Sequence, residues 1–310
     1  MKKFLYLFLV LGLFACSSDS EDDDSNPVYL DSNGVTIKAR DWAVVGDSGT
    51  INGITYTIVD SATLFNMAEN IEDLTRICTS RIISMNDLFK SMQNFNQDIG
   101  SWDTSSVTDM RGMFMGAISF NQDISSWNVS NVINMQSMFR ETLFNQPLNN
   151  WDVSNVTDMS GMFQSAQSFN QPLNNWDVSN ASIRSMFRGT ASFNQDLSAW
   201  DVSNINYLTD MFNNAQAFNQ PLNNWNVSNV LSTTSMFEGA ISFNQPLDNW
   251  NIENVFQMSH MFSGATAFNQ DLSAWDVENV TICHNFSCET PNWDWSAQPE
   301  FTNCNAGGCN

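Results

Sequence analysis

The chain has 310 residues, of which 42% are hydrophobic and 12% aromatic, and its formal net charge is −22. It is long and apolar enough to fold around a packed core, and its charge argues against nucleic acid or an anionic membrane surface as a partner. The last basic residue is Arg188, and only His260 and His284 are available for acid–base chemistry near neutral pH. The composition therefore disfavours an enzyme.

Residues 1–15 are typical of a lipoprotein signal peptide. Lys2 and Lys3 precede an apolar run over residues 4–15 that is too short for a membrane-spanning helix. The sequence Leu-Phe-Ala-Cys at residues 13–16 resembles a bacterial lipobox, which implies that Cys16 becomes the lipidated first residue of the mature chain. We therefore expect a protein that a lipid anchors to the membrane but that does not span it.

An acidic tether is predicted over residues 16–26. Residues 17–25 read SSDSEDDDS, which is too polar and charged to fold. The place of this run directly after Cys16 resembles the acidic export signal of Bacteroidota lipoproteins. This resemblance implies a protein exposed on the cell surface at the outer membrane.

Residues 27–81 are predicted to form an N-terminal capping module of mixed α and β structure. The segment 50–59 alternates in hydrophobicity around Asn52-Gly53, which predicts a β-hairpin. Asp60 or Ser61 then starts a short helix that continues to about residue 70. We expect this module to cover the apolar end of the repeats that follow, with Cys78 as a buried small hydrophobic residue.

A repeat of 24 or 25 residues fills residues 82–286. Each copy contains Phe-Asn-Gln and, seven residues after the Phe, a Trp. The eight copies begin at Phe95, Phe120, Phe144, Phe169, Phe193, Phe218, Phe243 and Phe268. The β-branched residue five after Trp favours a short strand, and the Met-Phe-x-x-Ala segment favours a short helical or 3₁₀ turn. Such a coil buries its apolar side only against identical neighbours, so the pattern predicts a repeat solenoid.

Three kinds of residue recur at fixed positions of the repeat, and each can be given a role. The repeated Asn residues are expected to form stacked amide ladders. The Trp column fits packing inside the coils, but it would stack on sugars if it were exposed. The Asp or Asn after Trp fits a turn in which its side chain bonds the backbone, although neighbouring carboxylates could also bridge calcium.

The repeat resembles a known family. The pattern V-x-x-M-x-x-MF-x-x-A-x-x-F over residues 156–169 is similar to the leucine-rich repeats of BspA-like bacterial surface proteins. The fuller pattern FNQPLNNWDVSNVTDMSGMF resembles the mycoplasma lipoprotein-associated variant of these repeats. The resemblance implies a leucine-rich-repeat-type solenoid on the cell surface. The Ile-Pro and in-repeat Cys of the more familiar branch are missing here.

Residues 287–310 are predicted to be a cysteine-containing C-terminal cap. Cys283 takes an inward Met position of the repeat, and Cys288, Cys304 and Cys309 follow. A zinc site with His284 is one reading, but the spacing differs from that of a zinc knuckle. Disulfides are the default outside the cytoplasm, and the four cysteines allow three pairings. We therefore predict disulfides here and no metal site.

The leading functional hypothesis is that the surface of the solenoid serves in protein binding or in adhesion. The alternatives are a structural surface-layer scaffold without a dedicated ligand and a glycan-binding accessory protein. No combination of nucleophile, histidine and acid is recognisable, so we predict no catalytic residues and no cofactor.

Overall fold

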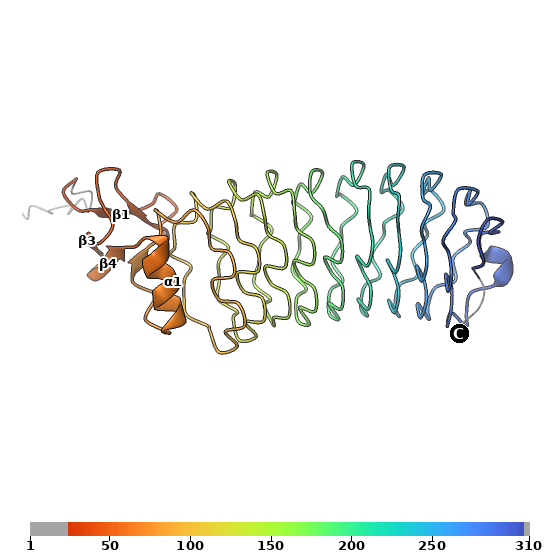
Figure 1. The fold of residues 1–310 in the computed structure, drawn as a ribbon, viewed down its shortest axis with the longest axis horizontal. Helices are drawn as coiled ribbons and strands as arrows, with labels where there is room; N and C mark the ends of the chain where they lie inside the picture. Colours follow the sequence, from red (N-terminus) through yellow and green to blue (C-terminus); the bar gives the residue numbers. More distant parts are fainter. Residues whose placement is uncertain (1–23, 307–310) are drawn as a thin grey trace, which may run out of the picture.

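The structure of the protein is a computed structural model that describes residues 24–306. Figure 1 shows an elongated molecule in which a small N-terminal module is followed by one row of coils. The predicted signal peptide, Cys16 and Cys309 lie outside the described residues. Within residues 24–306, no helix has the length and apolar character that crossing a membrane requires.

The N-terminal module combines two small sheets with one helix. Strands β1 (Val28–Leu30) and β2 (Ile37–Ala39) pair antiparallel. Strands β3 (Ser48–Ile51) and β4 (Ile54–Ile58) form a hairpin, and β5 (Ile77–Cys78) lies parallel to β4. Helix α1 (Ser61–Glu69) begins after Asp60, whose side chain accepts a hydrogen bond from the Thr63 N–H. The hairpin turns at Asn52 and Gly53, which both have positive φ angles.

The module shares its interior with the repeats. The two sheets enclose a small core of their own that contains the buried thiol of Cys78. Leu64 of α1 and Ile77 of β5 belong instead to the long core of the coils. The apolar end of the first coil is therefore packed against the module rather than exposed to water.

Each coil is described below by position, counted from the Phe of Phe-Asn-Gln as position 1. Consecutive coils are joined at position 15 by parallel bridges of a single residue, for example between Asp109 and Asn134. N–H groups at positions 16, 18, 20 and 22 then donate to carbonyls of the next coil. In one coil these donors are Met110, Gly112, Phe114 and Gly116, and the acceptors are Asn134, Gln136, Met138 and Arg140, at 2.8 to 3.0 Å.

The predicted helical or 3₁₀ turn in each coil is wrong. The segment instead forms three overlapping β-turns, closed by hydrogen bonds from Met113 N–H to Met110 O, from Met115 N–H to Gly112 O and from Ala117 N–H to Phe114 O. Positions 18 and 22 have positive φ angles in all nine coil segments, as at Gly112 and Gly116. A helix would direct its N–H groups to its own carbonyls, whereas these turns direct alternate N–H groups to the next coil. The predicted strand is reduced to one bridging residue.

The core of the row is built from apolar columns. In the coil that begins at Phe144, the side chains at positions 1, 5, 8, 10, 13, 16, 19, 20 and 23 are all buried. Phe rings at position 20 stack on those of neighbouring coils, as Phe187 does on Phe163 and Phe212 at 5.8 Å between ring centroids. Repeats of about 25 residues, an aromatic ladder and few regular elements fit a repeat solenoid.

The last coil is closed by Trp293. The main-chain N–H of Trp293 donates to Thr290 O just as the main-chain N–H of Phe268 donates to Ala265 O. Trp293 therefore occupies the place that the first Phe of a further coil would have. The indole packs edge-on against Phe268 at 4.7 Å between ring centroids. A 3₁₀ helix, η1 (Trp295–Ala297), follows.

Candidate binding face

The constant polar columns hold neighbouring coils together. At position 2, Asn170 Oδ1 accepts hydrogen bonds from the Asn194 N–H and from Gln195 Nε2, both at 2.9 Å. At position 12, Asn229 Nδ2 donates to Ser203 O of the preceding coil at 2.7 Å. These amides form hydrogen bonds between coils, as the sequence predicts. We therefore attribute the recurrence of Asn at these positions to the structure of the array.

The Trp column is buried. Seven of the eight indole N–H groups at position 8 donate to the position-5 carbonyl of the preceding coil, for example Trp200 to Leu173 O at 2.9 Å, and Trp102 donates to Leu74 O of the N-terminal module. All eight of these rings are nearly inaccessible to solvent. The column therefore packs the interior and offers no surface on which a sugar could stack.

The acidic column at position 9 forms turns. Asp152 Oδ1 accepts hydrogen bonds from the Ser154 N–H at 3.2 Å and from the Ser154 hydroxyl at 2.7 Å. Asn128 and Asn226 make the same two contacts in their coils. The hydroxyl and N–H bonds from Ser154 lower the pKa of Asp152.

We expect Asp152→Asn to leave stability nearly unchanged, because Asn keeps the accepting oxygen, and Asp152→Ala to cost about 1 kcal/mol. A carboxyl with a lowered pKa stabilises the fold above its ordinary value of 3.8 and loses this effect as the pH falls through the lower folded value. Urea unfolding at neutral and acidic pH measures both effects. If Asp152→Asn cost as much as Asp152→Ala, or if calcium raised the unfolding temperature, the carboxylate would hold a cation instead.

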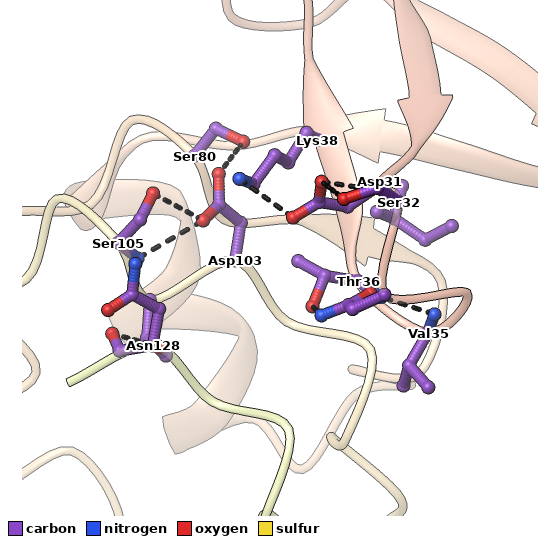
Figure 2. Close-up of polar contacts among 12 residues, drawn as sticks. Asp31, Ser32, Val35, Thr36, Lys38, Ser80, Asp103, Ser105 and Asn128 are labelled. Carbon is purple, nitrogen blue, oxygen red and sulfur yellow. Dashed lines mark hydrogen bonds and ion pairs between the residues drawn. The ribbon is translucent and has the colours of Figure 1, made fainter. Parts of the chain in front are cut away.

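One member of this column is buried at the junction with the N-terminal module. Asp103, only 4% exposed, accepts hydrogen bonds from the hydroxyls of Ser80 and Ser105 at 2.5 and 2.6 Å (Figure 2). Nearby, Lys38 forms an ion pair with Asp31 at 2.9 Å, which raises the pKa of Lys38 and lowers that of Asp31. These groups have partners within the protein, so the cluster fastens the module to the first coil.

Most of the side chains that remain lie at the surface around the ladder of bridges and turns. We call positions 14, 15, 17, 18 and 21 the ladder face. Ion pairs connect these positions between and within coils: Arg111 at position 17 lies 3.8 Å from Asp87 at position 18 of the preceding coil, and Lys90 at position 21 lies 3.4 Å from Asp87 of its own coil. The hydroxyls of Ser160 and Ser182 join positions 17 and 15 at 2.8 Å.

The ladder face differs from the rest of the surface in composition. Position 2 is always Asn and position 3 always Gln, whereas position 21 holds Lys, Met, Arg, Gln, Asn, Glu, Ser or Cys. Every basic residue after Arg81 lies on this face, and so do both histidines. These residues are Lys90, Arg111, Arg140, Arg184, Arg188, His260 and His284. The face also exposes apolar side chains, including Ile83, Ile133 and Phe256. Sequence reasoning missed it, although comparing the copies column by column reveals it.

Comparison with known proteins agrees with the repeat. The chain matches the model of a family described as "Mycoplasma protein of unknown function, DUF285" over residues 59–176, 140–207 and 181–296. The chain belongs to the DUF285 family. No curated protein and no solved structure matches it.

The cysteines lie at the C-terminal end of the DUF285 array. Cys283, at an inward Met position, forms a disulfide with Cys304, and Cys288 is also disulfide-bonded. Cys309 is outside the described residues. The bond between Cys283 and Cys304 ties the segment after the last coil to the core of that coil.

The two histidines of the DUF285 array lie next to each other in neighbouring coils. The rings of His260 and His284 meet edge-on at 5.4 Å between centroids, and the Ser259 hydroxyl lies 3.1 Å from His284 Nδ1. Within residues 24–306, no group of three or more His, Cys, Asp or Glu side chains is placed to hold a metal. We take the whole ladder face, of which this pair is a part, as the candidate site.

Proposed function

We propose that this DUF285-family chain is a surface lipoprotein whose array binds another protein through the ladder face. We also propose that the array is a leucine-rich-repeat-type solenoid like those of BspA-like surface proteins. The observation that carries the binding proposal is the contrast between constant and variable columns within one chain. Binding of a partner protein would explain why the variable columns, the basic residues and the exposed apolar side chains lie on the same face.

The constant columns make the same contacts in coil after coil, whereas the side-chain contacts between coils on the ladder face differ from coil to coil. Asn at positions 2 and 12 and Trp at position 8 each bond to a neighbouring coil. On the ladder face, most side chains are free of such bonds, so their identity is open to other demands. Apolar and basic side chains on one face of a solenoid supply the desolvated anchors and charges on which protein interfaces depend.

Charge gives the face a preferred kind of partner. The chain carries 33 acidic residues against 11 basic ones, so most of its surface repels acidic proteins. All basic residues of the array beyond Arg81 are nevertheless concentrated at positions 17 and 21, between Lys90 and Arg188. An acidic segment of a partner would be attracted to this half of the face and repelled elsewhere, which would fix its orientation.

The test compares two matched variants of the full chain. Ile133 on the ladder face is 51% exposed, and Ile241 at position 24, outside the face, is 45% exposed. Both should tolerate Glu without loss of stability, since neither is part of the core. We expect Ile133→Glu to weaken adhesion of intact cells to immobilised proteins, and Ile241→Glu to leave it unchanged. Equal adhesion by both variants and the wild type would favour a structural scaffold.

Display on the cell surface is a separate expectation that depends on Cys16 and the acidic residues after it. Cys16→Ala should release the protein from the membrane or leave it unprocessed, because the lipid could not be attached. Fractionation of cells and the mass of the mature chain measure this result. A protein that stays membrane-bound and processed after Cys16→Ala would contradict the lipid anchor.

The export signal is tested by neutralising the acidic run at Asp19, Glu21, Asp22, Asp23 and Asp24 with the corresponding amides. We expect protease added to intact cells to reach less of the variant than of the wild type. Unchanged accessibility would remove the export role but would leave the tether in place.

A further inference from the structure

The ladder of the array is interrupted at one point. The coil that begins at Phe169 lacks the residue at position 14, so Ala181 at position 13 is followed directly by Ser182 at position 15. Parallel bridges join Asp158 to Ser182 and Tyr207 to Ser232. Along the described part of the ladder, no bridge joins Ser182 to Tyr207. The missing residue thus removes the bridge between the fourth and fifth coils, although the N–H groups of Ser185, Phe187 and Gly189 still donate to carbonyls of the fifth coil.

Main-chain groups lose their partners at this gap. In the next coil, the Leu231 N–H donates to Asn206 O at 2.8 Å and the Leu208 N–H donates to Ser232 O at 3.0 Å. The N–H of Asn206 lacks such an acceptor, because the preceding coil has no residue at position 14. The N–H of Ile183 makes no bond to Tyr207 O. The gap therefore leaves both donors and acceptors of the backbone without ladder partners.

The amide column at position 12 is weakened on both sides of the fourth coil. At position 12, Asn155 donates to Ser130 O at 2.8 Å and Asn229 donates to Ser203 O at 2.7 Å. The corresponding bond from Asn204 to Ser179 O is stretched to 3.4 Å. Among the residues described, the side chain of Asn180 makes no hydrogen bond of this kind, so its amide is available to a ligand.

A hollow of about 420 Å³ lies over the gap. Its lining includes Asn180, Ser182, Arg184, Asn206 and Tyr207. The Arg184 guanidinium stacks on the Tyr207 ring at 3.9 Å from the centroid. Stacking holds the guanidinium flat on the ring and leaves its N–H edge free to bind a carboxylate with two parallel hydrogen bonds.

Arg184 has no carboxylate partner within residues 24–306, although the chain is strongly acidic. Arg188, one turn further along the same face, lies 3.6 Å from Asp210. The stacked Arg184 is thus oriented, exposed and without an ion-pair partner. We propose that the hollow is a binding site for the carboxylate of an acidic peptide segment in a partner protein.

The neighbouring groups favour a peptide over an acidic sugar. The gap offers N–H and carbonyl groups in the order of an interrupted parallel ladder, and a peptide backbone supplies the matching acceptors and donors. One face of Tyr207 is covered by the guanidinium, so that face is closed to stacking by a sugar ring. This inference rests on the proposed function and names the chemistry of the partner at one place on the ladder face.

Binding can be measured with fluorescently labelled peptides and the full chain. The probes are a glycine peptide with one central glutamate and blocked ends, the same peptide with glutamine, and an unblocked glycine peptide with a free terminal carboxylate. Unlabelled glucuronate serves as a competitor. We expect the glutamate peptide or the free-carboxylate peptide to bind, and the one that binds more tightly shows whether the site prefers a side-chain or a terminal carboxylate. The glutamine peptide should bind at least about tenfold more weakly.

Variants locate the site. Arg184→Gln should weaken binding about tenfold, because a charge-assisted pair is lost. Tyr207→Ser, which installs the residue of neighbouring coils, should weaken it by removing the stack. Insertion of Thr between Ala181 and Ser182 should restore the ladder, raise stability and abolish binding. Arg76→Gln, which changes an exposed arginine of the N-terminal module, is the matched control and should have no effect.

The proposal would be overturned if the glutamine peptide bound as tightly as the better of the two carboxylate peptides, if binding survived both Arg184→Gln and the Thr insertion, or if glucuronate alone bound. No binding of any carboxylate probe at about 10 mM would also overturn it. These failures would leave the comparison of Ile133→Glu with Ile241→Glu intact, so they are distinguishable from failure of the proposed function.

Discussion

Replacement of Phe187 by alanine should lower the free energy of unfolding by about 3–5 kcal/mol. The ring is fully buried at position 20. Between ring centroids, it lies 3.9 Å from Phe193, which begins the next coil, and 5.8 Å from Phe163 and Phe212 at position 20 of the two neighbouring coils. Its removal would leave a cavity in the middle of a stack, where coils on both sides hold the surrounding rings in place and prevent collapse.

Denaturant unfolding of the full chain measures this effect, with Phe256→Ala as the control. Phe256 is 38% exposed on the ladder face, and its truncation should cost less than about 1 kcal/mol. A similarly small cost for Phe187→Ala would mean that the Phe column does not pack the core. Hydrogen exchange should show the loss of protection first in the coils adjacent to Phe187, because stability in such arrays is passed between nearest neighbours.

The second large effect is expected at the C-terminal disulfide. Reduction of the bond between Cys283 and Cys304 should destabilise the end of the array by about 2–4 kcal/mol, since the bond closes a loop in the unfolded chain. The two cysteines are separated by 21 residues. The last coil should fray before the middle coils, because only the last coil relies on the tied segment for cover.

Intact mass distinguishes the alternatives for the four cysteines. If Cys283, Cys288, Cys304 and Cys309 form two disulfides, the oxidised chain should be lighter than the reduced chain by the mass of four hydrogens. Stoichiometric zinc in the purified protein, with free thiols and no mass deficit, would contradict the disulfide cap. The variant Cys304→Ser should reproduce the fraying of the last coil without any reductant.

Sequence reasoning was strongest where a residue type has one mechanical use. Asn52-Gly53 predicts a tight hairpin turn, and β3 and β4 meet there. Asp60 predicts a helix start, and it caps α1. Phe and Trp at fixed spacing predict an apolar column, and both are buried along the array. In each case one local interaction dominates the conformation.

It was weakest where backbone geometry depends on the next coil. Met-Phe-x-x-Ala has a spacing that suits a helical turn, but the structure turns through left-handed residues such as Ser137 and Glu141. Such a conformation is costly for these residue types by themselves, and hydrogen bonds to the following coil offset the cost. In the sequence, this left-handed conformation is indicated only by the Gly, Ser, Asp and Asn residues that are frequent at these positions.

The candidate site was out of reach for a different reason. A binding face is defined by side chains that share a surface rather than a motif, and position 17 acquires meaning only when the coils are stacked in register. The one-residue deletion near Ala181 is visible in the sequence. Its consequence, a break in two hydrogen-bonding columns beside a stacked arginine, depends on which groups lie opposite one another across the coils.

The main-chain N–H groups that bond across coils at positions 16, 18, 20 and 22 donate toward the following coil, and this one-way bonding makes the two ends of the rod chemically different. Along this run, the first coil presents carbonyl oxygens to whatever precedes it, and the last coil presents N–H groups to whatever follows. The two terminal segments are therefore not interchangeable. Whole coils, by contrast, have matching top and bottom surfaces. Duplication or loss of one complete repeat inside the array would lengthen or shorten the rod and leave both terminal junctions unaltered.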